Sequence, residues 1–257
     1  MLIKNQIYEA VITDYTSEGQ GIAHIEGCAV FIPNAIAGEK VKIRIEKAQK
    51  TWAAGKIVEI LEKSPHRINR ECPVAKLCGG CDFWHMDYEE ETRLKAERVR
   101  SCLNRIGGEN LDAVPILAAP TCHDYRNKAQ YAFGRGRNGQ TVAGVYQSST
   151  HKIVDIEKCM LTDPKADEIA NTVKKLLKSF KMKPYDEITR QGFLRHVLVK
   201  TAFKSGEVMV VLVTATPQFP SKRSFINALV GRHPEITTIV QNVNNKFTSM
   251  VLGDKSE

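Results

Sequence analysis

Alternation of apolar and polar residues dominates the first 63 positions of the chain. Five short segments follow this pattern and are separated by Gly, Pro and Asn: residues 7–15, 21–27, 28–33, 40–48 and 53–63. No helical period interrupts them, so they predict five strands. Such a series is typical of a small closed barrel of the oligonucleotide-binding kind, and a generic barrel that binds nothing fits the pattern equally well. Ser64, Pro65 and His66 then break the pattern and mark a boundary.

A helical period begins after residue 87. Asp87 and Glu90 have the spacing of a capping box, and apolar residues recur every three or four positions from Ala96 to Ile106. A pair of glycines at 107 and 108 then ends the predicted helix. Its other side carries several Lys and Arg residues, which is typical of a solvated face.

Strands and helices mix from residue 125 onward. We expect a helix over 164–183, capped by Asp163, with Pro164 at its first position. Its inward residues are expected to be Ile169, Val173, Leu176 and Phe180. A shorter helix is expected over 221–231. The expected strands occupy residues 128–134, 140–147, 151–156, 193–203, 207–215, 236–245 and 246–253.

These elements predict an α+β fold with a mainly antiparallel sheet. Lys204, Ser205 and Gly206 should form the turn of a hairpin between two of the strands. The expected organisation is a barrel over 1–63, a cysteine-bearing loop over 64–87, a helix and linker over 88–124, and a central α+β domain over 125–257.

Composition narrows the class of protein. With 42% hydrophobic and 26% charged residues, the chain resembles an ordinary soluble protein and not a disordered one. The sequence contains no run of about 18 apolar residues and has a polar N-terminus, so we expect a cytoplasmic protein with no membrane partner. The formal net charge of +8 favours a polyanionic partner, although many basic proteins bind no nucleic acid.

Three of the seven cysteines fall within ten residues, at Cys72, Cys78 and Cys81. Clustered thiols in a reducing compartment usually bind metal or perform redox chemistry. Gly79 and Gly80 would let this loop wrap around a metal, because glycine adopts positive φ angles.

Cys159 is the best candidate for a fourth ligand, since Cys28 and Cys102 are more plausible as small buried hydrophobes. Structural zinc sites usually pair two cysteine knuckles, whereas a lone distant cysteine is commoner with a 4Fe-4S cluster. The spacing therefore favours the cluster over zinc and over four unconnected thiols.

Gly134, Gly136 and Gly139 match the glycine pattern of dinucleotide sites. That pattern requires a helix directly after it, and here a strand is expected to follow. The glycines are better interpreted as a hairpin turn that carries Arg135 and Arg137 outward, toward phosphate or water.

Basic residues also gather in two of the expected strands. Arg126 and Lys128 should share one face, and Tyr125 and Tyr131 lie nearby for base stacking. Exposed charges on an ordinary sheet fit the same pattern. The predicted RNA-binding residues are Arg126, Lys128, Arg135, Arg195 and His196.

Taken together, these motifs resemble the family of RNA uracil-5-methyltransferases that modify 23S ribosomal RNA or transfer RNA. Residues 1–63 are similar to a TRAM domain, and CPVAKLCGGC with the later KCML resembles the family's cluster ligands. YRNKAQ, LRHVLVK and IVQNVNNKFTSMVLGD resemble successive motifs of its central domain.

The resemblance implies a 4Fe-4S cluster held by Cys72, Cys78, Cys81 and Cys159, with zinc as the minor alternative. It also implies S-adenosylmethionine as methyl donor, and 23S ribosomal RNA as substrate with tRNA as the alternative. A monomer is expected.

In this family a cysteine thiolate adds to C6 of uracil, C5 takes the methyl group, and a base removes the C5 proton. The family's Rossmann-like cofactor domain, nucleophile and base follow the NVN segment, and the helix over 88–107 packs on that domain. Because this sequence stops at Glu257, we expect the methyltransferase domain to be absent or truncated. On this reading the chain would have no catalytic residues and would be inactive alone. A free-standing cluster- or zinc-containing RNA-binding module is the alternative.

Overall fold

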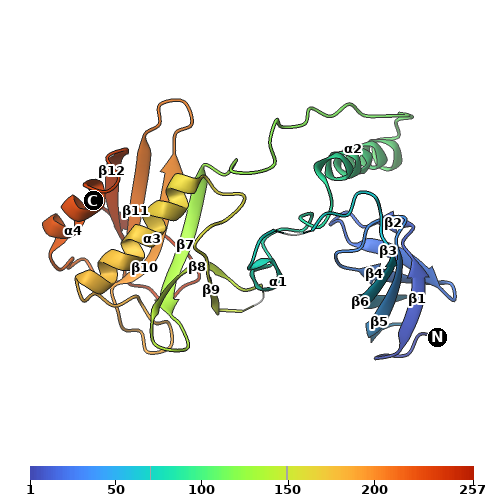
Figure 1. The fold of residues 1–257 in the computed structure, drawn as a ribbon, viewed down its shortest axis with the longest axis horizontal. Helices are drawn as coiled ribbons and strands as arrows, with labels where there is room; N and C mark the ends of the chain where they lie inside the picture. The colour runs from blue at the N-terminus through green and yellow to red at the C-terminus, as the bar shows by residue number, and fades with distance from the viewer. Residues whose placement is uncertain (70, 149) are drawn as a thin grey trace. The chain divides into compact units, whose positions relative to one another are not determined.

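The computed structural model describes residues 1–69, 71–148 and 150–257, and the chain divides into two compact units. Unit 1 comprises Met1–Glu71 and Gly80–Pro120, and unit 2 comprises Cys72–Gly79 and Thr121–Glu257. Figure 1 shows the elements of both units. Within the described residues, no helix combines the length and apolar character needed to cross a bilayer.

Unit 1 is built on a six-stranded sheet with the order β1-β5-β6-β4-β3-β2. Its strands are β1 Ile7–Val11, β2 Asp14–Tyr15, β3 Gly21–Ile25, β4 Cys28–Ile32, β5 Lys40–Ala48 and β6 Trp52–Glu62. The expected single strand over 7–15 is two strands, because the chain changes partner there. Ile12 N–H bonds to Glu39 C=O, whereas Thr13 N–H bonds to Ile22 C=O.

The sheet of unit 1 curls around an apolar core, and β1 also contacts β3. Strand β5 shows the alternation that the sequence predicts: Val41, Ile43 and Ile45 are fully buried, and the residues between them are not. The inward residues of β3, β4 and β6 complete the core.

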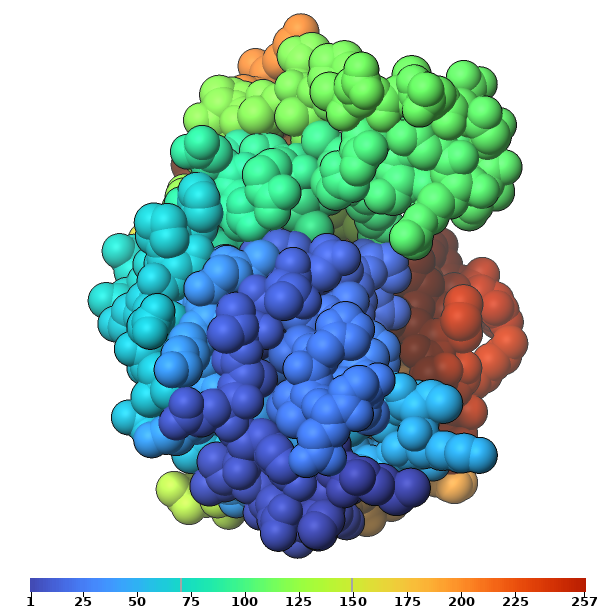
Figure 2. Space-filling view, turned by 90° about the vertical axis from the view of Figure 1, so that its right-hand side faces the viewer, coloured from blue at the N-terminus to red at the C-terminus, as the bar shows by residue number. Residues whose placement is uncertain are grey.

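Helix α2, Tyr88–Arg105, packs on this barrel. The predicted cap is confirmed, since the Asp87 carboxylate accepts a hydrogen bond from Glu90 N–H at 2.8 Å. The hydroxyl of Tyr15 donates to the buried Glu90 carboxylate at 2.8 Å and accepts from Ala37 N–H at 2.9 Å. Helix and barrel form one continuous surface in Figure 2, in green and blue.

Unit 2 contains a seven-stranded sheet with the order β13-β12-β11-β10-β7-β8-β9. Its strands are β7 Lys128–Arg135, β8 Thr141–Tyr146, β9 Ile153–Asp155, β10 Leu194–Thr201, β11 Val208–Thr214, β12 Ile236–Val243 and β13 Lys255–Ser256. Five of its six strand pairings are antiparallel, which agrees with the expected mainly antiparallel sheet, and one is parallel. Strands β11 and β12 are parallel, because helix α4, Lys222–Val230, forms a crossover between them in place of a hairpin turn.

Helices α3, Pro164–Ser179, and α4 cover one face of this sheet (Figure 1). The expected cap is confirmed, because the Asp163 side chain accepts a hydrogen bond from Lys165 N–H. Ile169, Val173 and Leu176 are buried as expected. The helix ends at Ser179, earlier than the expected residue 183.

Two predicted hairpin turns are confirmed. Gly206 has φ of 75° and donates to Ala202 C=O between β10 and β11. Between β7 and β8, Gly139 has φ of 77° and Gly136 N–H bonds to Gln140 C=O at 2.8 Å. The glycine pattern over 134–139 therefore makes a turn between strands and not a dinucleotide loop.

Candidate functional site

Three of the predicted RNA-binding residues are exposed cations on or beside strand β7. Arg126 is anchored through its backbone, since its N–H donates to Leu161 C=O and its C=O accepts from Asp163 N–H. Its side chain remains exposed, as do those of Lys128 and Arg135 at the two ends of the strand. Phosphate groups could therefore reach all three side chains.

Arg195 does not join that exposed group. It is 4% exposed, and its Nη1 donates to the carbonyl oxygens of Asn244 and Lys246 at 3.0 and 2.7 Å. Its guanidinium also lies over the ring of Tyr185, 4.6 Å from the centroid. The residue holds the 244–248 segment in place, and its charge is directed into the protein.

His196 is also buried, at 5% exposed. Its ring meets that of Tyr146 edge-on, with 6.5 Å between the centroids. Burial, assisted by the positive charge of Arg195, lowers the pKa of His196 to about 4. The imidazole is therefore neutral near pH 7 and adds no positive charge for an RNA partner.

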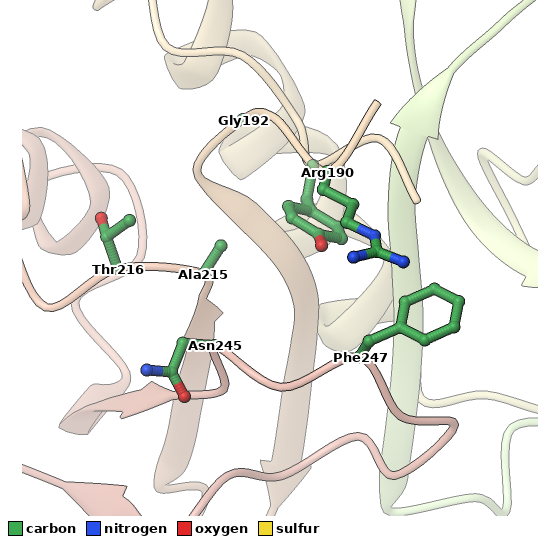
Figure 3. A pocket seen from close by; sticks show the side chains of 7 residues that line it. Arg190, Gly192, Ala215, Thr216, Asn245 and Phe247 are labelled. Atoms are coloured by element: carbon green, nitrogen blue, oxygen red, sulfur yellow. The ribbon is translucent and has the colours of Figure 1, made fainter. Parts of the chain in front are cut away.

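Unit 2 contains a cavity of about 270 Å³ where β10 begins and β11 ends (Figure 3). Tyr185 contributes to its lining, together with Arg190, Gly192, Ala215, Thr216, Asn245 and Phe247. Figure 3 shows the Arg190 side chain beside the Phe247 ring, while Thr216 and Asn245 lie on the other side of Ala215. The Arg190 guanidinium is 4.6 Å from the centroid of the Phe247 ring.

Sequence reasoning missed this cavity. Its two walls, residues 185–192 and 215–216 with 245–247, are far apart in the sequence and meet only after the sheet has formed. The segment NNKFTSM contains one indication of a site, because Phe247 is an isolated aromatic residue among polar ones. Such a residue is more often exposed than buried when no apolar period surrounds it.

The cysteine loop lies around the short helix α1, Ala75–Cys78. Gly79 ends this helix at φ of 65°, which confirms the need for glycine there. Cys72, Cys78 and Cys159 belong to unit 2 and Cys81 to unit 1, and all four are half-buried.

Cys159 is fixed by a buried carboxylate that sequence reasoning also missed. Its N–H donates to Asp167 Oδ2 at 2.7 Å, and the Tyr131 hydroxyl donates to Asp167 Oδ1 at 2.7 Å. Burial raises the pKa of Asp167, while these two hydrogen bonds act in the opposite direction. Strand β7 and helix α3 are thereby linked through the loop that carries Cys159.

The described residues do not gather the cysteines into a metal centre. Across 1–69, 71–148 and 150–257, no three or more His, Cys, Asp or Glu side chains are arranged to hold an ion. The four cysteines have suitable donor chemistry for a cluster. The 4Fe-4S cluster remains a prediction from the sequence.

Comparison with known proteins finds a family match for the barrel and relatives of the whole chain. Residues 3–58 match the TRAM domain family, which covers the barrel of unit 1 and confirms that part of the resemblance. Along nearly its whole length, the chain is related to proteins described as RNA methyltransferases.

One such relative, from Halalkalibacterium halodurans, is 38% identical over 255 residues, which cover 99% of this chain and 56% of that protein. Another, from Clostridium acetobutylicum, is 38% identical over 255 residues, with 98% and 55% covered. The chain thus spans about half the length of the curated relatives it matches.

A solved structure shares the fold. The tRNA (uracil-54, C5)-methyltransferase of Pyrococcus abyssi, in complex with S-adenosyl-L-homocysteine, superposes with a TM-score of 0.67 at 22% identity. The match covers 96% of this chain and 54% of that one.

These matches correct two expectations. An absent methyltransferase domain and an inactive portion were expected from the sequence, yet almost every residue of the chain has a counterpart in a methyltransferase. The same matches do not support the expectation that catalytic residues are missing.

Proposed function

We propose that this protein is an RNA methyltransferase that transfers a methyl group from S-adenosylmethionine to C5 of uridine. The observation that carries the proposal is the 38% identity with an RNA methyltransferase across 99% of the chain. The TRAM match over residues 3–58 supports an RNA substrate.

The exposed cations on or beside strand β7 are proposed to bind RNA. Arg126, Lys128 and Arg135 are exposed and could each contact phosphate. The net charge of +8 favours such contacts through counterion release. Arg195 and His196 are assigned structural roles, because both are buried.

The chemistry of the proposed reaction requires a thiolate that adds to C6 and a base that removes the C5 proton. S-adenosylmethionine, when bound, would supply the methyl group. The described residues are assigned the binding and orientation of RNA, and none is assigned the thiolate or base role.

Methyl transfer is tested directly with the purified protein and radiolabelled S-adenosylmethionine. 23S ribosomal RNA is the proposed substrate, with bulk tRNA as the alternative, and products are digested to nucleosides. Label in 5-methyluridine is expected. Label in another nucleoside would contradict the uridine assignment, and no label with either RNA would contradict the proposal as a whole.

The role of these cations is tested by the salt dependence of RNA binding. Arg126→Ala and Lys128→Ala should each weaken binding and reduce the slope of log K against log salt by roughly 0.7–0.9, the value of one phosphate contact. Arg232→Ala is the matched control, since this residue is exposed and lies beyond α4. Equal slopes for all three variants would contradict the assigned surface.

We further propose that Cys72, Cys78, Cys81 and Cys159 hold a 4Fe-4S cluster, on the spacing of the cysteines in the sequence. Anaerobic purification should give about four irons and four sulfides per chain. Cys159→Ser should lose the iron, and the exposed Cys102→Ser should retain it. Stoichiometric zinc without iron would overturn the cluster in favour of a zinc site.

A further inference from the structure

The cavity of unit 2 is suited to one flat aromatic group. At about 270 Å³ it is slightly smaller than the 300–1,000 Å³ typical of pockets for drug-sized ligands. A nucleobase is a smaller ligand of flat shape. The cavity is lined on one side by an aromatic ring and on the other by polar side chains (Figure 3).

The aromatic side is open to solvent. Phe247 is 73% exposed, and the guanidinium of the exposed Arg190 lies 4.6 Å from its ring centroid. A guanidinium over an aromatic ring presents a planar, cationic surface. Bases stack on such rings, and their phosphates are attracted to such cations.

The polar side can distinguish a base from a plain aromatic ring. Asn245 offers both an amide donor and an amide acceptor, and Thr216 offers a hydroxyl. Figure 3 shows both side chains on the side of Ala215 away from Phe247. These groups match the hydrogen-bonding edge of a base that has left its stack.

Both walls of the cavity are held in place by contacts with the rest of unit 2. Arg195 fixes the Phe247 segment through the carbonyl oxygens on both sides of Asn245, those of Asn244 and Lys246. On the opposite wall, Gly192 has φ of 116°, and a Cβ there would lie 2.1 Å from the Pro184 carbonyl oxygen. A preformed site loses less conformational entropy on binding.

The walls of the cavity contain two cations, Arg190 and Lys246, and two carboxylates, Asp186 and Glu187. Glu187 accepts a hydrogen bond from the Tyr146 hydroxyl at 3.2 Å and lies 3.3 Å from His151 Nδ1. Asp186 faces inward to its own turn, where its Oδ1 accepts from Ile188 N–H and Thr189 N–H. Lys246 is paired with Asp254 at 2.5 Å. Arg190 has no carboxylate partner among the ion pairs of the described residues, so its charge is available to a phosphate.

We propose that this cavity binds one unstacked base of single-stranded RNA. The base stacks on Phe247, its edge meets Asn245 and Thr216, and the adjoining phosphate lies near Arg190. The inference rests on the proposed function, because it assumes that RNA is the substrate, and it adds a nucleotide site in unit 2.

The test measures binding of fluorescein-labelled octauridylate and of a blunt RNA duplex of equal length. Phe247→Ala should weaken octauridylate binding by about 5-fold or more, the effect of one lost stacking contact. Phe247→Tyr should retain binding. Arg190→Ala should also reduce the salt slope by roughly 0.7, whereas Arg190→Lys should keep the slope. Duplex binding should change less than 2-fold in each variant.

Phe203→Ala is the matched control, because this aromatic is 93% exposed at the β10–β11 turn, away from the cavity lining. Equal losses for Phe203→Ala and Phe247→Ala, or no loss for Phe247→Ala, would overturn the nucleotide site while leaving the proposed function intact. If the unmodified protein binds neither RNA, the proposed function itself fails.

Discussion

The guanidinium of Arg195 lies 4.6 Å from the ring centroid of Tyr185 and donates hydrogen bonds to backbone carbonyls about 50 residues further along the chain. A single buried cation thus joins strand β10 to both walls of the cavity. Its role is structural, although its position in a basic motif predicted contact with RNA.

Arg195→Met should therefore destabilise unit 2. The substitution leaves the buried carbonyl of Asn244 and the partly buried carbonyl of Lys246 without their donor, which costs about 2–4 kcal/mol in the free energy of unfolding. Urea unfolding followed by far-UV circular dichroism measures this loss. Arg126→Met, at an exposed arginine, should change the stability by less than about 0.5 kcal/mol. Equal stability of the two variants would contradict the structural role.

His196 should make unit 2 less stable in acid. Because burial lowers its pKa to about 4, the unfolded chain takes up a proton near pH 6.5 and the folded chain does not. The free energy of unfolding of unit 2 is therefore unaffected by His196 above pH 6.5. It falls as the pH decreases toward 4, by roughly 3 kcal/mol at most.

His196→Phe should remove this part of the acid dependence while keeping a ring beside Tyr146. The measurement is the free energy of unfolding between pH 7.5 and 4.5. His24→Phe, at an exposed histidine of unit 1, serves as the control. An unchanged pH slope in His196→Phe would show that the buried imidazole does not titrate as described.

Glu39 should be essential for the stability of unit 1. Its fully buried carboxylate accepts hydrogen bonds from Arg67 and from Ile36 N–H, which ties the segment after β6 to the barrel. Glu39→Gln leaves the charge of Arg67 uncompensated and should cost about 3 kcal/mol.

Both tryptophans, Trp52 and Trp84, lie in unit 1, so their fluorescence reports its unfolding. The matched control is Glu59→Gln, which breaks the exposed pair with Lys42 and should cost less than about 1 kcal/mol. A similar small loss for Glu39→Gln would show that the buried pair contributes no more than a surface one.

His66 and Asp87 should make the start of helix α2 dependent on pH. Their side chains are 2.9 Å apart, and the hydrogen bond to Asp87 raises the pKa of His66 against the opposing effect of burial. Burial opposes ionisation of Asp87, but hydrogen bonds from Glu90 N–H and His66 outweigh it and lower its pKa.

The pair therefore stabilises unit 1 most between about pH 4 and 6.5 and loses its effect as the pH rises through the raised pKa of His66. His66→Gln should lower the melting temperature, followed by tryptophan fluorescence, at pH 5.5 more than at pH 8.5. A difference that is constant with pH would exclude the ion pair as its cause.

Local patterns predicted much of the fold. Helix α3 begins at the expected Pro164 with Ile169 and Val173 buried, because capping and helical period are properties of a short segment. The turn at Gly206 was predictable for the same reason. The parallel pairing of β11 with β12 was not, since it depends on where α4 returns the chain to the sheet.

The candidate site was predicted less well. Exposed Arg126 and Lys128 lie on or beside a strand where alternation identifies the solvent side. Arg195 was predicted to be exposed for RNA but is buried. Strand β10 has a register shift between Leu194 and His196 and is buried on both faces there. In a strand that is buried on both faces, the alternation of apolar and polar residues does not identify a solvent-exposed side.

By itself, the sequence determined the barrel strands, the capped helices, the glycine turns and the four cysteines whose spacing suggests a cluster. The tertiary structure alone decided that Arg195 is a buried anchor and that Arg190 and Phe247 line one cavity. The physical reason is the distance along the chain over which each kind of interaction acts. Periodicity and capping reflect energies within a few neighbouring residues, whereas a hydrogen bond between residues 51 positions apart exists only once the sheet has formed.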